Sequence, residues 1–153
     1  GDNPVHDVRD KLAEAGKRLV NTWWPAIAAG TAPREPQDPA LGRYWPARTA
    51  DDGLIDWSQS AEAVRNLVRA LVSPWPGAFT FAGSHKVVVR RCVAAPPLSE
   101  PPGTIVSSDV EGITVACGCG SVRLTAIEIE GRAAGPLDRE HAGLRPGAWL
   151  GAR

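Results

Sequence analysis

Apolar residues recur at helical spacing through the first thirty positions of the chain. The stripe consists of Val5, Val8, Leu12, Leu19, Val20, Trp23 and Ile27. Residues three, four and seven positions apart share one face of a helix, so this spacing predicts an amphipathic helix. Asn3-Pro4 supplies a cap and a proline suited to the first helical position, and Gly30 is a typical terminator. Pro25 lacks an N–H group, and we expect it to interrupt or restart the helix.

Residues 31–52 break this periodicity. They contain four prolines and few regularly spaced apolar residues, which predicts a long extended connector. A second helical pattern begins after Ser58, a good N-cap, and is predicted to end near Ser73, because Pro74 cannot continue a helix. Its apolar face consists of Ala61, Val64, Leu67, Val68 and Leu71. This helix therefore has one face to bury against a neighbouring element.

Short runs of β-type residues replace the helical spacing further along the chain. Strands are predicted over residues 78–82, 86–95, 104–107, 113–117, 122–129 and 148–150, with a short helix over 137–143. Gly83-Ser84 provides a turn between the first two strands, and His85 is assigned to that turn. Five or six strands joined by tight turns predict a small closed barrel. The fold class is therefore α+β, with two helices and a connector ahead of the barrel.

Composition narrows the class of protein. The chain has 153 residues, and 17 basic residues balance 17 acidic ones, so no net field draws it to nucleic acid or lipid. Three cysteines and no export signal favour a reduced, cytoplasmic protein. No run approaches the roughly 20 apolar residues of a membrane helix. Met is absent and the chain opens directly into a helix, so we expect a piece of a longer protein.

The pair Cys117-Gly118-Cys119 has a spacing that invites a metal interpretation. A closed zinc site needs about four ligands. The remaining cysteine is Cys92, and His6, His85 and His141 show neither ligand spacing nor a nucleophile motif. We therefore expect no metal site and no catalytic residue among these side chains.

Three segments within thirty residues carry the most specific signal. They are Asp51-Asp52-Gly53-Leu54-Ile55-Asp56-Trp57, Asn66-Leu67-Val68-Arg69-Ala70 and Pro74-Trp75-Pro76-Gly77-Ala78-Phe79. Further landmarks follow in order along the chain, among them Pro102-Gly103-Thr104-Ile105 and Leu144-Arg145-Pro146-Gly147. Together these segments resemble the C-terminal part of folate-dependent formyltransferases, the family of methionyl-tRNA formyltransferases and sugar or hydroxyornithine N-formyltransferases. The resemblance covers almost the whole chain.

The resemblance implies three parts. Residues 1–30 correspond to the last helix of an otherwise absent Rossmann-type catalytic domain, residues 31–57 to an extended linker, and residues 58–153 to a connecting helix with a C-terminal OB-like barrel. It also implies 10-formyltetrahydrofolate as the donor, an amine acceptor, and catalytic Asn, His and Asp residues that lie before residue 1. This chain contains no Asn-x-His pair. We therefore expect the chain alone to be inactive, not to bind the donor, and to partner the catalytic half. Transfer of a formimidoyl group is an open alternative.

Four residues are candidates for positioning the acceptor or for contacts between the two halves. Asp56 and Trp57 come from the first motif, and Asn66 and Arg69 lie off the apolar face of the second helix. The functional interpretation is that they contact the acceptor. The structural interpretation is that Asp56 caps backbone N–H groups, Trp57 packs, and Asn66 and Arg69 form a hydrogen-bond network. The structural interpretation is favoured for all four residues.

Lys86, Arg90 and Arg91 are the candidate polyanion contact, because strand alternation places Lys86 and Arg90 on one face. A tRNA-binding surface needs several bases that contact phosphates. Seven acidic residues between positions 100 and 140 dilute the bases of the barrel. This balance favours a small biosynthetic amine over tRNA as the acceptor. The alternative is a non-catalytic barrel that binds tRNA or another ligand. Exposed tryptophans on a detached piece would favour a dimer.

Overall fold

The computed structural model describes residues 5–129 and 131–151. The chain divides into two compact units, residues 3–48 and residues 49–153, and each is described by itself. The first unit contains α1 (Val5–Ala28) and an extended segment with the 3₁₀ turn η1 (Pro39–Leu41). The predicted start at Asn3-Pro4 lies outside the described residues.

The helix α1 runs through Pro25, so the predicted interruption is wrong. Proline removes one backbone donor, but the next turn still closes, because the Ala29 N–H donates to the Pro25 carbonyl at 3.0 Å. The predicted end at Gly30 is confirmed. This glycine has φ 70°, and the following Thr31 N–H returns to the Ala26 carbonyl. None of the described residues of α1 is buried.

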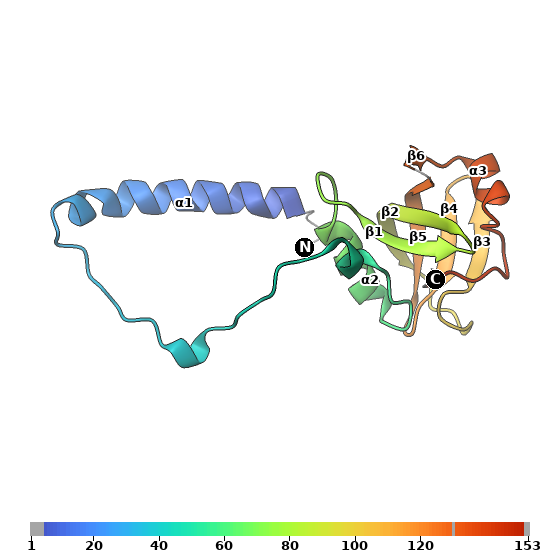
Figure 1. Ribbon diagram of the computed structural model, residues 1–153, viewed down its shortest axis with the longest axis horizontal. Helices are drawn as coiled ribbons and strands as arrows, with labels where there is room; N and C mark the ends of the chain where they lie inside the picture. The colour runs from blue at the N-terminus through green and yellow to red at the C-terminus, as the bar shows by residue number, and fades with distance from the viewer. Residues whose placement is uncertain (1–4, 130, 152–153) are drawn as a thin grey trace. The chain divides into compact units, whose positions relative to one another are not determined.

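The second unit is built on a strongly curled antiparallel sheet (Figure 1). Its strands are β1 (Ala78–Ala82), β2 (His85–Ala95), β3 (Ile105–Asp109), β4 (Gly112–Ala116), β5 (Ser121–Ile129) and β6 (Arg132–Ala133). The main strands pair in the order β1-β2-β5-β4-β3, and β6 pairs with β5. The predicted α+β class with a small barrel-like sheet is confirmed. The strand β6 was not predicted, because two residues carry no readable alternation.

The C-terminal segment closes the curled sheet between its two edge strands. Gly151 exchanges two backbone hydrogen bonds with Phe81 on β1, at 3.0 and 3.1 Å. Two residues earlier in space, the Ile105 N–H of β3 donates to the Ala148 carbonyl at 2.8 Å, and the Leu150 N–H donates to the Gly103 carbonyl at 2.8 Å. The predicted last strand over 148–150 is therefore a pair of isolated bridges rather than a strand. It satisfies edge groups that would otherwise face solvent.

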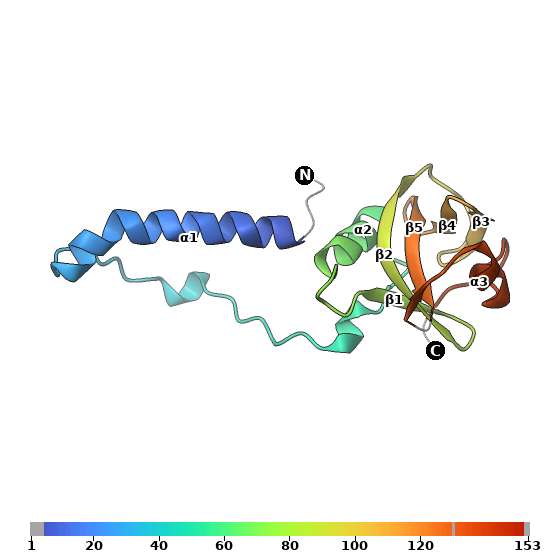
Figure 2. The ribbon, with the colours of Figure 1, turned by 90° about the horizontal axis from the view of Figure 1, so that it is seen from above.

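The short helices cap this sheet on opposite sides (Figure 2). The helix α2 (Ala61–Ala70) packs against β2 and β5 through the buried side chains of Val64 and Val68. Its N-cap is Ser60, whose Oγ accepts from the Ala63 N–H at 3.2 Å, so the prediction of Ser58 is wrong by two residues. The helix also ends at Ala70, earlier than predicted. On the other side lies α3 (Pro136–His141).

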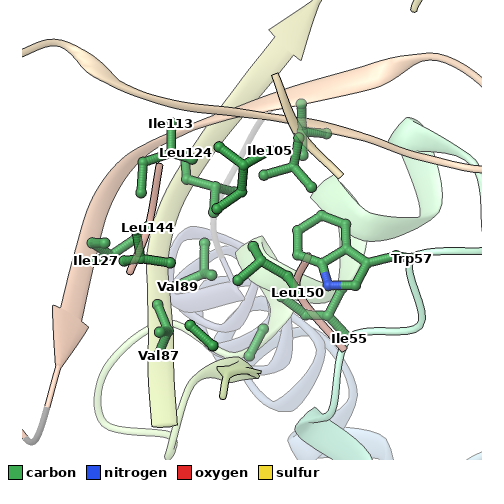
Figure 3. Packing of buried hydrophobic residues seen from close by; sticks show 14 of the residues in the cluster. Ile55, Trp57, Val87, Val89, Ile105, Ile113, Leu124, Ile127, Leu144 and Leu150 are labelled. Carbon is green, nitrogen blue, oxygen red and sulfur yellow. The ribbon is translucent and has the colours of Figure 1, made fainter. Parts of the chain in front are cut away.

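One hydrophobic core fills the inside of the sheet (Figure 3). Alternating residues of the strands point inward, and they include Val87, Val89, Ile105, Ile113, Val115, Val122, Leu124 and Ile127. Ile55 and Trp57, from the segment ahead of α2, point into the same core together with Leu150 (Figure 3). Each fully buried side chain of this size contributes about 1.5–3 kcal/mol of transfer free energy. The end of the linker is therefore part of the barrel core.

His85 corrects a detail of the first hairpin. The predicted turn at Gly83-Ser84 is confirmed, but His85 is the first residue of β2, where it pairs with Ala82. The pairing extends to the very end of the hairpin because Gly83, at φ 56°, takes the left-handed conformation that a two-residue turn requires.

Candidate functional site

The candidate site is the segment where the linker joins the barrel, residues 54–59. The Ile55 N–H donates to the Phe79 carbonyl at 2.8 Å, which extends β1 by one bridge. Because strand geometry alternates, Ile55 and Trp57 then face the core and Asp56 faces solvent. Inside the core, the Trp57 Nε1–H donates to Thr80 Oγ1 at 3.0 Å.

Asp56 is held as a local cap. Its Oδ1 accepts from the Ser58 N–H at 3.0 Å and from the Ser58 hydroxyl at 2.6 Å, and its Oδ2 accepts from Gln59 Nε2 at 2.9 Å. These bonds, led by that of the Ser58 hydroxyl, hold the pKa of the Asp56 carboxyl below its usual value. The carboxylate is exposed, so it remains accessible to a ligand while it fixes the turn.

Gly118 locks this turn onto the barrel. Its N–H lies 2.9 Å from both the Trp57 and the Gln59 carbonyl oxygens, and a Cβ at Gly118 would overlap the Ser58 carbonyl. Next to it, the Ala61 N–H donates to the Cys119 carbonyl at 2.8 Å. The pair of cysteines around Gly118 therefore marks a backbone docking point.

A groove of about 450 Å³ lies beside Asp56. It is lined by Leu54, Ile55, Asp56, Trp57, Ser58, Pro102, Trp149 and Gly151. Trp149 is 59% exposed, and its Nε1–H donates to the Pro102 carbonyl at 3.1 Å. Neither Trp149 nor Pro102 was among the predicted site residues. The glycine on each side of this pair, Gly103 and Gly151, was the available signal for a close approach.

Asn66 and Arg69 are not among the residues that line the groove. Asn66 is exposed on α2, and Arg69 is partly exposed in its last turn. The structure thus brings Asp56 and Trp57 together and leaves the two helix residues apart from them.

The three strand bases have different environments. Arg90 Nη2 pairs with Glu128 Oε2 at 2.8 Å, and its Nη1 contacts the Trp75 and Pro76 carbonyls at 3.5 and 3.4 Å. Lys86 Nζ lies 3.9 Å above the centre of the Phe79 ring, a cation–π contact. Arg91 is exposed beside a register shift between β2 and β5. Arg90 therefore fastens a loop, whereas Lys86 and Arg91 present their charge to solvent.

The cysteines and histidines do not converge. Among the described residues, no three His, Cys, Asp or Glu side chains are placed to hold a metal ion. Burial raises the pKa of both Cys92 and Cys117 to about 11, and Cys119 is exposed. His85 and His141 line a second pocket, of about 230 Å³, beside α3. No helix in the described part of the chain is long and apolar enough to cross a membrane.

The family model for the C-terminal domain of formyl transferases matches residues 48–142. Methionyl-tRNA formyltransferase of Citrifermentans bemidjiense is 37% identical over 154 residues, which cover 99% of this chain and 48% of that protein. The enzyme of the same name from Geobacter sulfurreducens is 36% identical, over 98% of this chain and 47% of its own length. The chain thus spans about half the length of the curated relatives it matches.

A solved structure shares the fold. HypX from Aquifex aeolicus matches with a TM-score of 0.60 and 18% sequence identity, over 83% of this chain and 23% of HypX. A second HypX structure, in complex with tetrahydrofolic acid, matches with a TM-score of 0.55. At this identity the likeness concerns the fold alone. The family match over residues 48–142, which contain the locked turn at Asp56 and the barrel, identifies the chain as a member of the formyl transferase C-terminal domain family.

Proposed function

We propose that this chain is the C-terminal part of an enzyme that transfers a formyl group from 10-formyltetrahydrofolate to an amine. In this proposal a catalytic half precedes the chain and contains the reacting groups. The observation that carries it is the coverage: nearly all of this chain aligns with about half of each relative. The work of the chain is then to position the acceptor and to support the catalytic half.

The chemistry agrees with that division. Formyl transfer needs a general base for the attacking amine and hydrogen-bond donors for the developing oxyanion, gathered in one cleft. In the described groove the ionisable side chain is Asp56, and three donors already occupy its carboxylate. A carboxylate committed in this way is a weak general base. It supports a positioning role for Asp56 rather than a chemical one.

The first unit has the surface expected of a domain-packing helix. Large apolar side chains of α1 are exposed in this chain: Val8, Leu12, Leu19, Val20, Trp23, Trp24 and Ile27. Residues at this spacing form one stripe that a folded neighbour would bury. We assign the stripe to the interface with the catalytic half, and residues 31–57 to the linker.

For the acceptor we propose the amino group of an aminoacyl-tRNA. The relatives are named methionyl-tRNA formyltransferases, and this weighs against the small amine favoured by the overall charge balance. The bases are also segregated. Residues 63–99 contain Arg65, Arg69, Lys86, Arg90 and Arg91 and no Asp or Glu. This basic segment forms α2 and the β1–β2 hairpin, which pack together, and it suits a polyanion.

The test is a formyl-transfer assay with the complete gene product and with residues 1–153 alone. The complete protein should formylate methionyl-tRNA in the presence of 10-formyltetrahydrofolate, and the chain alone should show no turnover. Reversing the charge of Arg91 should weaken tRNA binding and reduce its salt dependence, since each phosphate contact contributes a slope of about −0.9. A matched change at Arg145, outside the basic segment, should not. Transfer to small amines with no transfer to tRNA would overturn the choice of acceptor, and turnover by the chain alone would overturn the division of labour.

A further inference from the structure

The indole of Trp149 is a fixed plate on the surface of the barrel. Its Nε1–H is tied to the Pro102 carbonyl at 3.1 Å. Its ring lies against the backbone at Gly103 and Gly151, where an added Cβ would overlap the indole atoms. One face of the ring is thus covered by glycine backbone while the side chain remains 59% exposed. A large aromatic held in one orientation loses little conformational entropy when a ligand stacks on it.

Asp56 lines the same groove and retains one acceptor position. A carboxylate offers about four lone-pair sites. The Ser58 N–H and hydroxyl use two on Oδ1, and Gln59 uses one on Oδ2. The remaining site on Oδ2 belongs to an ionised and exposed group whose orientation the other three bonds fix. It is a preorganised acceptor for a cationic donor.

The groove combines three features that select one kind of side chain. An aromatic face attracts a cation, a carboxylate accepts its N–H groups, and the apolar residues Leu54, Ile55 and Pro102 pack against an alkyl stem. Arginine matches all three, because its guanidinium is planar, always charged and weakly hydrated. The negative charge of Asp56 disfavours a phosphate in the same place. Charge complementarity therefore favours a guanidinium over a nucleotide.

We propose that the groove between Trp149 and Asp56 binds an arginine side chain presented by the catalytic half of the enzyme. The proposal rests on the proposed function insofar as it requires such a half. One wall of the groove is residues 54–58, the end of the linker, so a segment attached through that linker is held at a high effective concentration. The relatives are about twice as long as this chain, which leaves a partner of domain size to supply the arginine.

The direct test uses residues 1–153 and N-acetyl-arginine amide as the probe. The indole N–H resonance of Trp149, assigned from a Trp149→Leu variant, should shift and saturate as the probe is added. N-acetyl-citrulline amide, which keeps the shape and lacks the charge, should bind more weakly by roughly fivefold or more. The Asp56→Asn and Trp149→Leu variants should each lose affinity by a similar factor. Two exposed residues serve as matched controls, and Trp75→Leu and Asp51→Asn should leave binding unchanged.

Three outcomes overturn the proposal. They are equal binding of the citrulline probe, unchanged binding by a folded Asp56→Asn variant, and a response to adenosine monophosphate in place of arginine, which would make the groove a nucleobase site. Thermal melts and circular dichroism identify any variant that fails to fold, and Trp149→Phe then replaces Trp149→Leu.

The complete enzyme separates the source of the arginine from the proposed function. There the Trp149 resonance should no longer respond to the probe, because the catalytic half already fills the groove. A response as large as that of the chain alone would overturn the assignment to the catalytic half. If the probe binds the chain and is blocked in the complete enzyme, but no formyl transfer is found, the groove stands and the proposed function fails.

Discussion

The Trp57 Nε1–H donates a hydrogen bond of 3.0 Å to Thr80 Oγ1 in the interior of the barrel. The Thr80 hydroxyl lies 3.4 Å from the Gly151 carbonyl in the closing segment. Three parts of the chain, the end of the linker, β1 and the C-terminal segment, therefore meet at one buried polar contact. Such a contact is costly to leave unsatisfied, so it fixes how the linker enters the barrel.

Removing the donor of Trp57 should destabilise the barrel. We expect Trp57→Phe to lower the free energy of unfolding by about 1–3 kcal/mol, because it orphans Thr80 Oγ1 and leaves a small cavity. Urea denaturation followed by far-UV circular dichroism measures the change. Trp75→Phe is the matched control, since Trp75 is 53% exposed, and it should fall within about 0.5 kcal/mol of the parent. Equal effects for the two variants would contradict the role assigned to Trp57.

Gly118 should not tolerate a methyl group. In Gly118→Ala the new Cβ would overlap the Ser58 carbonyl, and the N–H bonds to Trp57 and Gln59 would have to lengthen. We expect a loss of about 1–3 kcal/mol, the usual cost of overpacking. Gly16→Ala is the contrasting control, because nothing lies within 4 Å of a Cβ there and the helix should gain about 0.5–1 kcal/mol of stability. Thermal denaturation of both variants checks the opposite signs.

The carboxyl of Asp56 should titrate below its usual value of 3.8, because the Ser58 hydroxyl, Gln59 and the Ser58 N–H stabilise the charged form. A lowered pKa in the folded state means that this group stabilises the fold above the unfolded value, and that the stabilisation is lost as pH falls below 3.8. Carboxyl NMR titration measures the pKa directly. Ser58→Ala should move it upward, and a titration curve unaffected by that change would refute the assigned cause.

The three cysteines should differ in reactivity. Cys92 and Cys117 have a pKa of about 11 because burial disfavours the thiolate, whereas Cys119 is exposed. At mildly alkaline pH we expect Ellman's reagent to modify one thiol quickly in the folded protein and all three after denaturation. Cys119→Ser should remove the fast phase. Fast modification of two or more thiols in the folded protein would show that the buried sites open.

The same two thiols predict a loss of stability at high pH. Their folded-state pKa is raised above the usual 9.0, so the unfolded chain ionises first. The stabilisation is fully present below pH 9 and declines as pH rises toward about 11. Urea midpoints across this range measure the decline. A Cys92→Ala variant should show a shallower pH dependence, and an unchanged slope would contradict the assignment.

Much of the fold is legible in local patterns. The stripe from Val5 to Ile27 indicated a helix, and the glycine at position 30 marked its end. Alternation and turn residues placed the hairpin of β1 and β2 around Gly83. The errors lie where a side chain competes for a backbone group. Asp56 binds the Ser58 N–H and hydroxyl, so the cap of α2 passes to Ser60, two residues later than the pattern predicts.

The groove illustrates what local patterns leave open. Residues 54–58, 102 and 149–151 line it, and they are brought together only when the C-terminal segment bridges β1 and the start of β3. Helix and strand periods are local and survive in the sequence, because backbone geometry repeats every few residues. The partner of Trp149 depends on which edge the last segment joins and on two glycines that lack a Cβ, and that pairing is settled by packing of the whole barrel.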